Sequence, residues 1–152
     1  MNQLIISPLK GFSALEFGST AEHAVSLFGD PDETEQLNDE VLEAESLVYH
    51  YWEKGFSLFF NQEAKLKLTC VEVDAEDALL WNEYVFRMNE GQIIELFKKN
   101  GFELTETEQH EWGERRLSFD DALVDLYFEN GILVSVNFGL LPDDKKYYFL
   151  PN

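Results

Sequence analysis

GFSLFFNQEAKLKLTCVEV, residues Gly55–Val73, is the stretch from which the fold can be read. Two runs of apolar residues flank a polar tip, as expected for two antiparallel strands joined by a turn. A second stretch with the same pattern, ALVDLYFENGILVSVNF, occupies Ala122–Phe138. Its Asn130-Gly131 pair is a strong signal for a hairpin turn. The two stretches together indicate that one structural unit occurs twice in the chain.

A short helix is predicted before each hairpin. Ser19 and Glu22 have the spacing of a capping box at the start of an amphipathic segment, Thr20–Phe28. Asn89 and Gln92 repeat that spacing before a second segment with an apolar face. Each proposed unit therefore begins with a helix of two or three turns.

Further strands are predicted at Ser46–Trp52, Phe102–Glu106 and Arg115–Phe119, where aromatic and β-branched residues are frequent. The acidic segment Asp30–Glu45 is interpreted as a loop. We therefore expect an α+β fold, in which two helix-plus-antiparallel-β-meander repeats pack as one domain. The two repeats can join edge to edge into a continuous sheet with the helices on one face.

The predicted domain organisation covers the whole chain, 1–152, as a single domain. The internal repeats span about residues 17–74 and 86–139, and residues 75–85 connect them. Residues 140–152 form a C-terminal tail whose KKYYFL run either adds an edge strand or lies across a sheet face.

The charge of the chain is strongly unbalanced. Its 152 residues include 30 acidic and 11 basic ones, which gives a formal net charge of −19 at pH 7. Such a field repels phosphate backbones and attracts cationic partners. We therefore expect no nucleic-acid partner, and either a basic protein partner or acidity that serves solubility alone.

The chain contains one cysteine, Cys70, which lies within a strand pattern. It cannot form an intrachain disulfide, so we interpret it as a small buried apolar residue in a reducing compartment. The segment Met1–Phe12 lacks the basic start and apolar run of a signal peptide, and no stretch of sequence is long and apolar enough to span a membrane. A cytoplasmic, bacterial protein without a membrane partner is expected.

Three short motifs carry a resemblance to a known family. FGST (Phe17–Thr20), LFGDPDE (Leu27–Glu33) and the Gly-Phe-x-Leu-x-Phe strand at Gly55–Phe60 follow one another in order. The stretch Gly18–Phe138 thereby resembles the β-lactamase-inhibitory-protein-like and outer-membrane-lipoprotein (SmpA/OmlA) family, present in tandem. This resemblance implies a helix-packed antiparallel sheet whose open face binds another protein. The chain differs from that family in lacking a lipidated cysteine and a disulfide pair.

Motifs for enzymatic chemistry are not found in the sequence. There is no Gly-x-Ser-x-Gly, no P-loop and no dinucleotide fingerprint. The three histidines, His23, His50 and His110, lack a second ligand at metal-binding spacing. We therefore expect no enzyme activity, no cofactor and no metal site.

Residues that bind a partner are predicted instead. They combine aromatic rings with carboxylates: Phe59, Trp52, Asp125, Tyr127, Asp39 and Glu40. Aromatic rings in a polar setting are common interface anchors because they bury a large area with few rotatable bonds. The alternative is that Phe59 and Tyr127 close a second layer formed by the connector or the tail.

The leading functional hypothesis is a protein-binding module, specifically an immunity-type inhibitor that masks a basic toxin or enzyme with its acidic surface. One alternative is a structural or assembly protein that self-associates through an unpaired sheet edge. Another is a small-ligand-binding domain with a cleft between the repeats. The sequence leaves the oligomeric state open.

Overall fold

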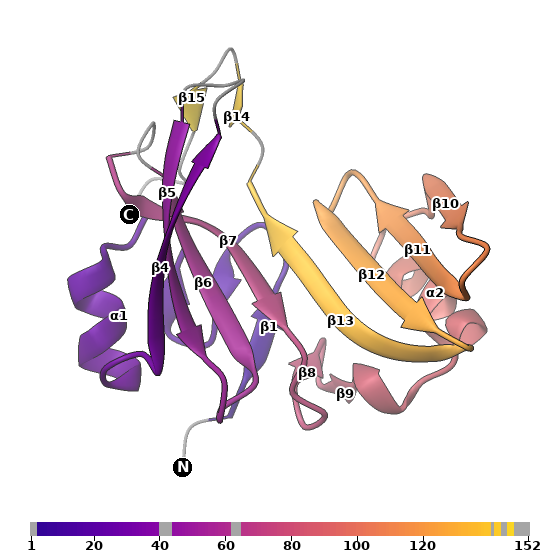
Figure 1. Cartoon of the computed structure of the whole chain (residues 1–152). Coiled ribbons are helices and arrows are strands. Elements are labelled where there is room, and N and C mark those ends of the chain that lie inside the picture. The colour runs from indigo at the N-terminus through magenta and orange to yellow at the C-terminus, as the bar shows by residue number, and fades with distance from the viewer. Residues whose placement is uncertain (1–2, 40–43, 62–64, 141, 144–145, 148–152) are drawn as a thin grey trace.

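A large antiparallel sheet dominates the computed structural model, which describes residues 3–39, 44–61, 65–140, 142–143 and 146–147 (Figure 1). In spatial order, the large sheet consists of β10 (Glu106–Gln109), β11 (Glu114–Phe119), β12 (Val124–Glu129), β13 (Ile132–Gly139), β7 (Lys67–Val73), β6 (Phe56–Asn61), β5 (Ala44–Tyr51) and β4 (Glu33–Asp39). Strands β4 to β7 form one meander and β10 to β13 form another. The sheet is therefore built from two four-stranded sets, each consecutive in sequence.

The two meanders meet through their last strands. β7 and β13 pair antiparallel over four positions, from Val73 opposite Val136 to Cys70 opposite Gly139. Because each of these strands has its own meander on its other side, the pairing makes all eight strands continuous (Figure 1). Strands β4 and β10 are left as the outer edges of the large sheet.

One helix precedes each meander, and local capping explains where each begins. In α1 (Ala21–Phe28) the Thr20 hydroxyl accepts a hydrogen bond from the backbone N–H of His23 at 3.2 Å. Helix α2 (Glu90–Lys99) has the predicted capping box, since Asn89 and Gln92 exchange side-chain-to-backbone hydrogen bonds of 2.8 and 2.9 Å. The second helix start is confirmed, whereas the first N-cap lies one residue later than the sequence predicted.

A small mixed sheet packs against the buried, inner face of the large sheet. In spatial order it consists of β3 (Leu15–Glu16), β2 (Gly11–Phe12), β1 (Ile5–Ser7), β8 (Leu79–Leu80) and β9 (Glu83–Tyr84). The pairing of β1 with β8 is parallel. A 3-10 helix, η2 (Val85–Arg87), follows β9, and β14 (Pro142–Asp143) pairs with β15 (Lys146–Tyr147) as a separate two-stranded sheet. The N-terminal segment is thus fastened to the connector between the two meanders.

The core lies between the inner face of the large sheet and a layer made of both helices and the small sheet. One cluster of buried residues joins all these elements, including Phe12 of β2, Leu58 of β6 and Phe97 of α2. The Phe97 and Phe119 rings stack with centroids 3.8 Å apart, which ties α2 to β11. Since residues of both meanders belong to this cluster, the two halves fold around shared apolar contacts.

These findings confirm an α+β fold with antiparallel meanders, but not one continuous sheet. The described strands divide between the eight-stranded sheet, the five-stranded mixed sheet and the small β14–β15 pair. The connector, residues 75–85, contributes β8 and β9 to the mixed sheet. Strands of two residues are too short for a period-two pattern to appear in the sequence.

Two further predictions of local structure are wrong. The segment interpreted as an acidic loop contains β4, which pairs with β5 over seven positions. The strand predicted at Phe102–Glu106 begins only at Glu106, because Phe102 and Leu104 are used as half-buried contacts to the core instead. In both places tertiary pairing outweighs the low strand propensity of Glu, Asp and Asn.

The buried Tyr51 predicts a loss of stability in alkali. Its hydroxyl donates a hydrogen bond to the Gly29 carbonyl at 3.0 Å, and burial, with smaller contributions from Tyr49, Asp30 and Asp32, raises the pKa of Tyr51 to about 12. The unfolded chain loses this proton near the ordinary pKa of 10.0. The contribution is therefore fully present below pH 10 and falls as the pH rises toward 12, by up to about 1.4 kcal/mol per pH unit.

Urea unfolding at pH 8, 10 and 11 tests this expectation. Tyr51→Phe is expected to be less stable than the wild type at pH 8, by about 1 kcal/mol, because it lacks the hydrogen bond. Its stability is expected to fall less steeply above pH 10. Equal slopes for the two proteins would contradict the assignment to Tyr51.

Candidate functional site

The outer face of the large sheet carries an unbroken cross-strand row of polar side chains. Read from one edge to the other, this polar row is Glu106, Ser118, Asp125, Asn137, Glu72, Ser57, His50 and Glu33. Side chains directly opposite each other on paired strands share a face. The row contains four carboxylates and no lysine or arginine, so the middle of this face is acidic.

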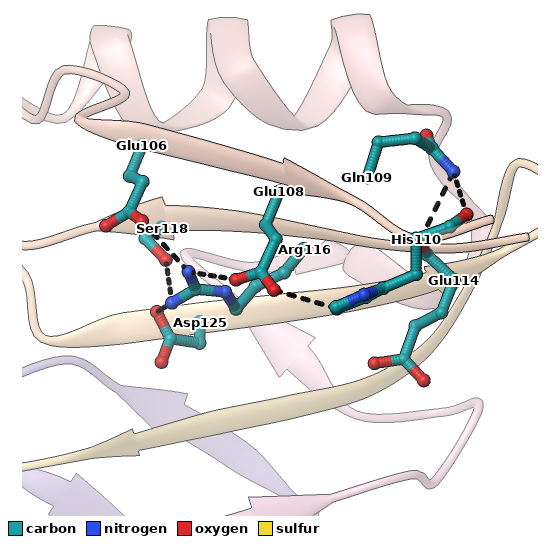
Figure 2. A network of polar contacts seen from close by, with 8 residues as sticks. All are labelled: Glu106, Glu108, Gln109, His110, Glu114, Arg116, Ser118 and Asp125. Atoms are coloured by element: carbon teal, nitrogen blue, oxygen red, sulfur yellow. Dashed lines mark hydrogen bonds and ion pairs between the residues drawn. The ribbon is translucent and has the colours of Figure 1, made fainter.

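A single guanidinium is shared by three carboxylates at one end of this face (Figure 2). Arg116 lies 2.8 Å from Glu108 and 3.1 Å from Glu106, and it donates a hydrogen bond to Ser118 at 3.0 Å. Its distance to Asp125 is 3.9 Å, beyond hydrogen-bonding range. One positive charge therefore leaves this group negative, and Asp125 has the weakest interaction of the three carboxylates.

A hollow of about 260 Å³ opens beside the polar row, where β12 and β13 meet β7. Asp120, Asp125 and Asn137 supply polar groups to its lining, and Leu123 and Leu140 supply apolar surface. The Oδ1 atom of Asn137 is buried and has no hydrogen-bond partner among the described residues. Leaving such an acceptor unpaired costs about 1–3 kcal/mol, so a donor entering the hollow would be favoured.

Cys70 also lines the hollow, so it lies on the outer face of the sheet. The sequence predicted a small buried apolar residue here, without assigning it to either face of the sheet. Burial, together with the negative charges of Glu72 and Asp125, raises the pKa of the Cys70 thiol to about 12. The thiol is therefore protonated at neutral pH, and the thiolate needed for nucleophilic or metal chemistry is disfavoured.

A second, smaller hollow of about 90 Å³ lies in the first meander. It is lined by His50, Trp52, Phe56, Ser57, Glu72 and Asp74. Both ring nitrogens of His50 are engaged, one with the Ser57 hydroxyl at 2.7 Å and the other with Glu35 at 2.9 Å. The imidazole is thus held in place as a part of the sheet surface.

Two exposed tryptophans stand at opposite ends of the outer face. Trp52 is 58% exposed and its ring stacks on His50, with centroids 4.1 Å apart. Trp112 is 73% exposed and stacks on His110 at 4.3 Å. His110 in turn contacts Glu108 at 2.9 Å (Figure 2). Each indole is therefore fixed against an imidazole while its other face remains accessible.

The predicted partner-binding residues share the outer face only in part. Asp125 and Tyr127 are neighbours on β12, and Phe59 faces the same side from β6. Two strands separate β12 from β6, and Phe59 and Tyr127 lie on opposite sides of the polar row along the strands, so they are more than about 14 Å apart and do not form one patch. Asp39 is the last residue of β4, but the structure does not describe its side chain. Glu40 lies outside the described residues.

Sequence reasoning missed Trp112, Arg116, Asn137 and Glu72 as members of this face. One signal for the missing edge strands was present, because the tetrapeptide ETEQ occurs twice, at residues 33–36 and 106–109. These copies form the start of β4 and the whole of β10. They place Glu35 and Glu108 at matching positions, each in contact with a histidine that stacks on a tryptophan.

Comparison with known proteins yields one structural likeness. No family model and no curated protein matches the sequence. The fold is similar to a crystal structure of an extracellular protein containing a SCP domain from Bacillus anthracis strain Ames, with a TM-score of 0.50 and 18% sequence identity. The likeness covers 85% of this chain and 44% of that chain, so this chain spans less than half the length of the protein it matches.

These findings overturn the resemblance to the β-lactamase-inhibitory-protein-like and outer-membrane-lipoprotein family. The motifs behind it have a local explanation: Thr20 caps the start of α1, and Gly29 ends the helix with a φ of 84°. Such caps are common to helices of unrelated folds.

The expected cytoplasmic location is also contradicted, because the matched protein is described as extracellular. One unpaired cysteine cannot form an intrachain disulfide in any compartment, so it was a weak guide to location. Separately, no helix in the described part of the chain is long and apolar enough to cross a membrane.

Proposed function

We propose that the chain is a non-enzymatic protein-binding module that holds a basic protein against the outer face of its large sheet. The observation that carries this proposal is the polar row, which spans eight strands and includes four carboxylates without a lysine or arginine. The guanidinium of Arg116, beside this row, is already shared by three carboxylates. A cationic partner would relieve the repulsion among these charges and would be steered toward the face.

The exposed tryptophans suit the same role. Each indole is held by a stacked imidazole, so little side-chain entropy is lost when a partner covers it. Tryptophan is among the residues most enriched at the energetic centres of protein interfaces. In the most specific form of the proposal, the partner is a cationic toxin or enzyme, and the module acts as its immunity-type inhibitor.

Reactive groups on the face support a binding role rather than a catalytic one. The Cys70 thiol keeps its proton at neutral pH, since burial and Glu72 raise its pKa to about 12. Both nitrogens of His50 are occupied by Ser57 and Glu35. Proton transfer to a substrate would first require these contacts to break.

We also infer that the two halves of the chain are internal repeats, consistent with boundaries near residues 17–74 and 86–139. Each half has the same order of one helix and four strands, and in each half the register between the third and fourth strands shifts by one residue, at Thr69 of β7 and at Val134 of β13. The duplicated ETEQ segment begins each meander. If the halves are repeats, the polar row is made of two equivalent acidic surfaces that join where β7 pairs with β13.

Affinity capture with charge-reversed baits tests the proposed function. The bait Glu72→Lys/Asp125→Lys reverses two charges in the polar row. The matched control, Glu76→Lys/Glu95→Lys, makes the same net-charge change at exposed carboxylates outside that row. We expect the wild type and the control to capture the same basic protein at low salt, and the first bait to lose it. Equal capture by both baits would contradict a role for the face.

A further inference from the structure

The larger hollow combines negative charge with an apolar wall. Its polar side is formed by Asp120, Asp125 and Asn137, and its apolar side includes Leu123, Phe138 and Leu140. At about 260 Å³ it is smaller than the roughly 300–1,000 Å³ of pockets that hold drug-sized ligands. It is therefore suited to one side chain, not to a large cofactor.

The charge in this hollow is poorly compensated. Asp125 lies 3.9 Å from Arg116, which makes its shorter contacts to Glu106 and Glu108. Within the described residues, the carboxylate of Asp120 has neither a hydrogen-bond nor an ion-pair partner. A cation in the hollow would meet Asp120, which has no ion pair among the described residues, and Asp125, whose nearest guanidinium is 3.9 Å away and shared with two other carboxylates.

Asn137 adds an independent requirement for a donor. Its Oδ1 is shielded from solvent and accepts no hydrogen bond from the described part of the chain. The Asn137 side chain is hydrogen-bonded to Tyr127, and its remaining acceptor would be satisfied by a bound water or by a donor from another molecule. An ammonium or guanidinium group carries several N–H donors and can satisfy this oxygen and a carboxylate together.

The smaller hollow shows how the other half uses the corresponding place. His50 and Ser118 occupy matching positions in the two halves, because His50 pairs with Ser57 and Ser118 pairs with Asp125. Trp52 and Asp120 each follow that position by two residues, so they match as well. The Trp52 indole stacks on His50 there, and the hollow shrinks to about 90 Å³. In the first half the Trp52 indole thus occupies the position that the Asp120 carboxylate occupies in the second half, where the hollow is larger.

We propose that the larger hollow receives a lysine or arginine side chain of the partner protein, with its charged head between Asp120 and Asp125 and its alkyl stem along Leu123. The inference rests on the proposed function and names the chemical group that the partner presents. Long basic side chains are suited to this arrangement, because their stems pack on apolar surface while their heads stay polar. An anionic ligand is disfavoured by the same two carboxylates.

Titration of the ¹⁵N-labelled protein with small lysine derivatives tests the hollow without needing the partner. The probes are Nα-acetyl-lysine N-methylamide and its uncharged counterpart, Nα-acetyl-norleucine N-methylamide. We expect the lysine probe to shift the signals of Cys70 and the Asn137 side-chain amide saturably, and the norleucine probe to leave them unchanged. Asp120→Asn/Asp125→Asn is expected to weaken binding of the lysine probe at least tenfold, whereas Glu76→Gln/Glu95→Gln is expected to leave it unchanged.

Three results would overturn the inference. These are equal shifts from both probes, lysine-induced shifts scattered over the acidic surface, and binding that survives the double Asp→Asn change. If cadaverine, a free diamine, binds more than tenfold tighter than the lysine probe, the hollow selects a small diamine and the protein side chain is excluded as its ligand. The bait experiment can fail while this titration succeeds, or the reverse, so the two proposals are separately testable.

Discussion

Replacing Leu58 with aspartate is expected to unfold the chain. Leu58 lies in the middle of β6 with 0% of its surface exposed, between Tyr49 of β5 and Val71 of β7. The change removes about 1.5–3 kcal/mol of apolar burial and leaves a carboxylate unpaired in the core, which costs several kcal/mol more. That sum is comparable with the whole stability of a typical domain, about 5–15 kcal/mol.

Circular dichroism and urea unfolding would show this loss, and Ile132→Asp is the matched control. Ile132 is also a branched apolar residue in a strand of the large sheet, but it is 66% exposed. Its aspartate variant is expected to fold. A Leu58→Asp variant that keeps a cooperative transition near the wild-type midpoint would show that the inner face of β6 is not part of the core.

Replacing Gly139 with alanine is expected to loosen the join between the two meanders. A Cβ atom at this position would lie 2.3 Å from the Thr69 carbonyl oxygen and 3.0 Å from the Cα of Cys70. Both neighbours are backbone atoms of β7, so the clash can be relieved only if β13 and β7 move apart. We expect the free energy of unfolding to fall by about 1–3 kcal/mol or more, as for other overpacked sites. We also expect faster hydrogen exchange of the Leu140 amide, which donates a hydrogen bond to the Thr69 carbonyl oxygen.

Gly91→Ala is expected to raise the stability of the protein, whereas Gly139→Ala is expected to lower it. Gly91 lies in the first turn of α2, and a Cβ there meets only the Asn89 side chain, at an ordinary contact distance of 3.5 Å. Alanine in a helix is favoured over glycine by about 0.5–1 kcal/mol, so this variant is expected to be more stable. If Gly139→Ala proved as stable as Gly91→Ala, the close approach of β13 to β7 would be refuted.

The helices and central strands could be predicted because their signals are local. The capping box of α2 needs only Asn89 and Gln92, and the hairpins need only alternating residues on either side of a turn. The edge strand β4 could not be predicted in this way, since its residues are mostly charged or polar. Its seven pairings with β5 become possible only once β5 is in place.

The candidate site was predicted less completely than the fold. Asp125, Tyr127 and Phe59 lie on the outer face, but the sequence could not give the distance between β12 and β6. That distance depends on which strands join the two meanders. The hollow beside Asp125 depends on the same join, because Cys70 and Asn137 come from its two strands.

What the sequence by itself determined is therefore the set of local units: two capped helices, two hairpins and a strongly acidic chain. Only the tertiary structure decided that β7 and β13 pair, that the short strands of the N-terminus and connector form a second sheet, and that the polar row crosses the whole large sheet. The physical reason is sequence separation. Helix caps and turns are stabilised by contacts within a few residues, whereas pairing of Val73 with Val136 gains its free energy only after the intervening chain has folded.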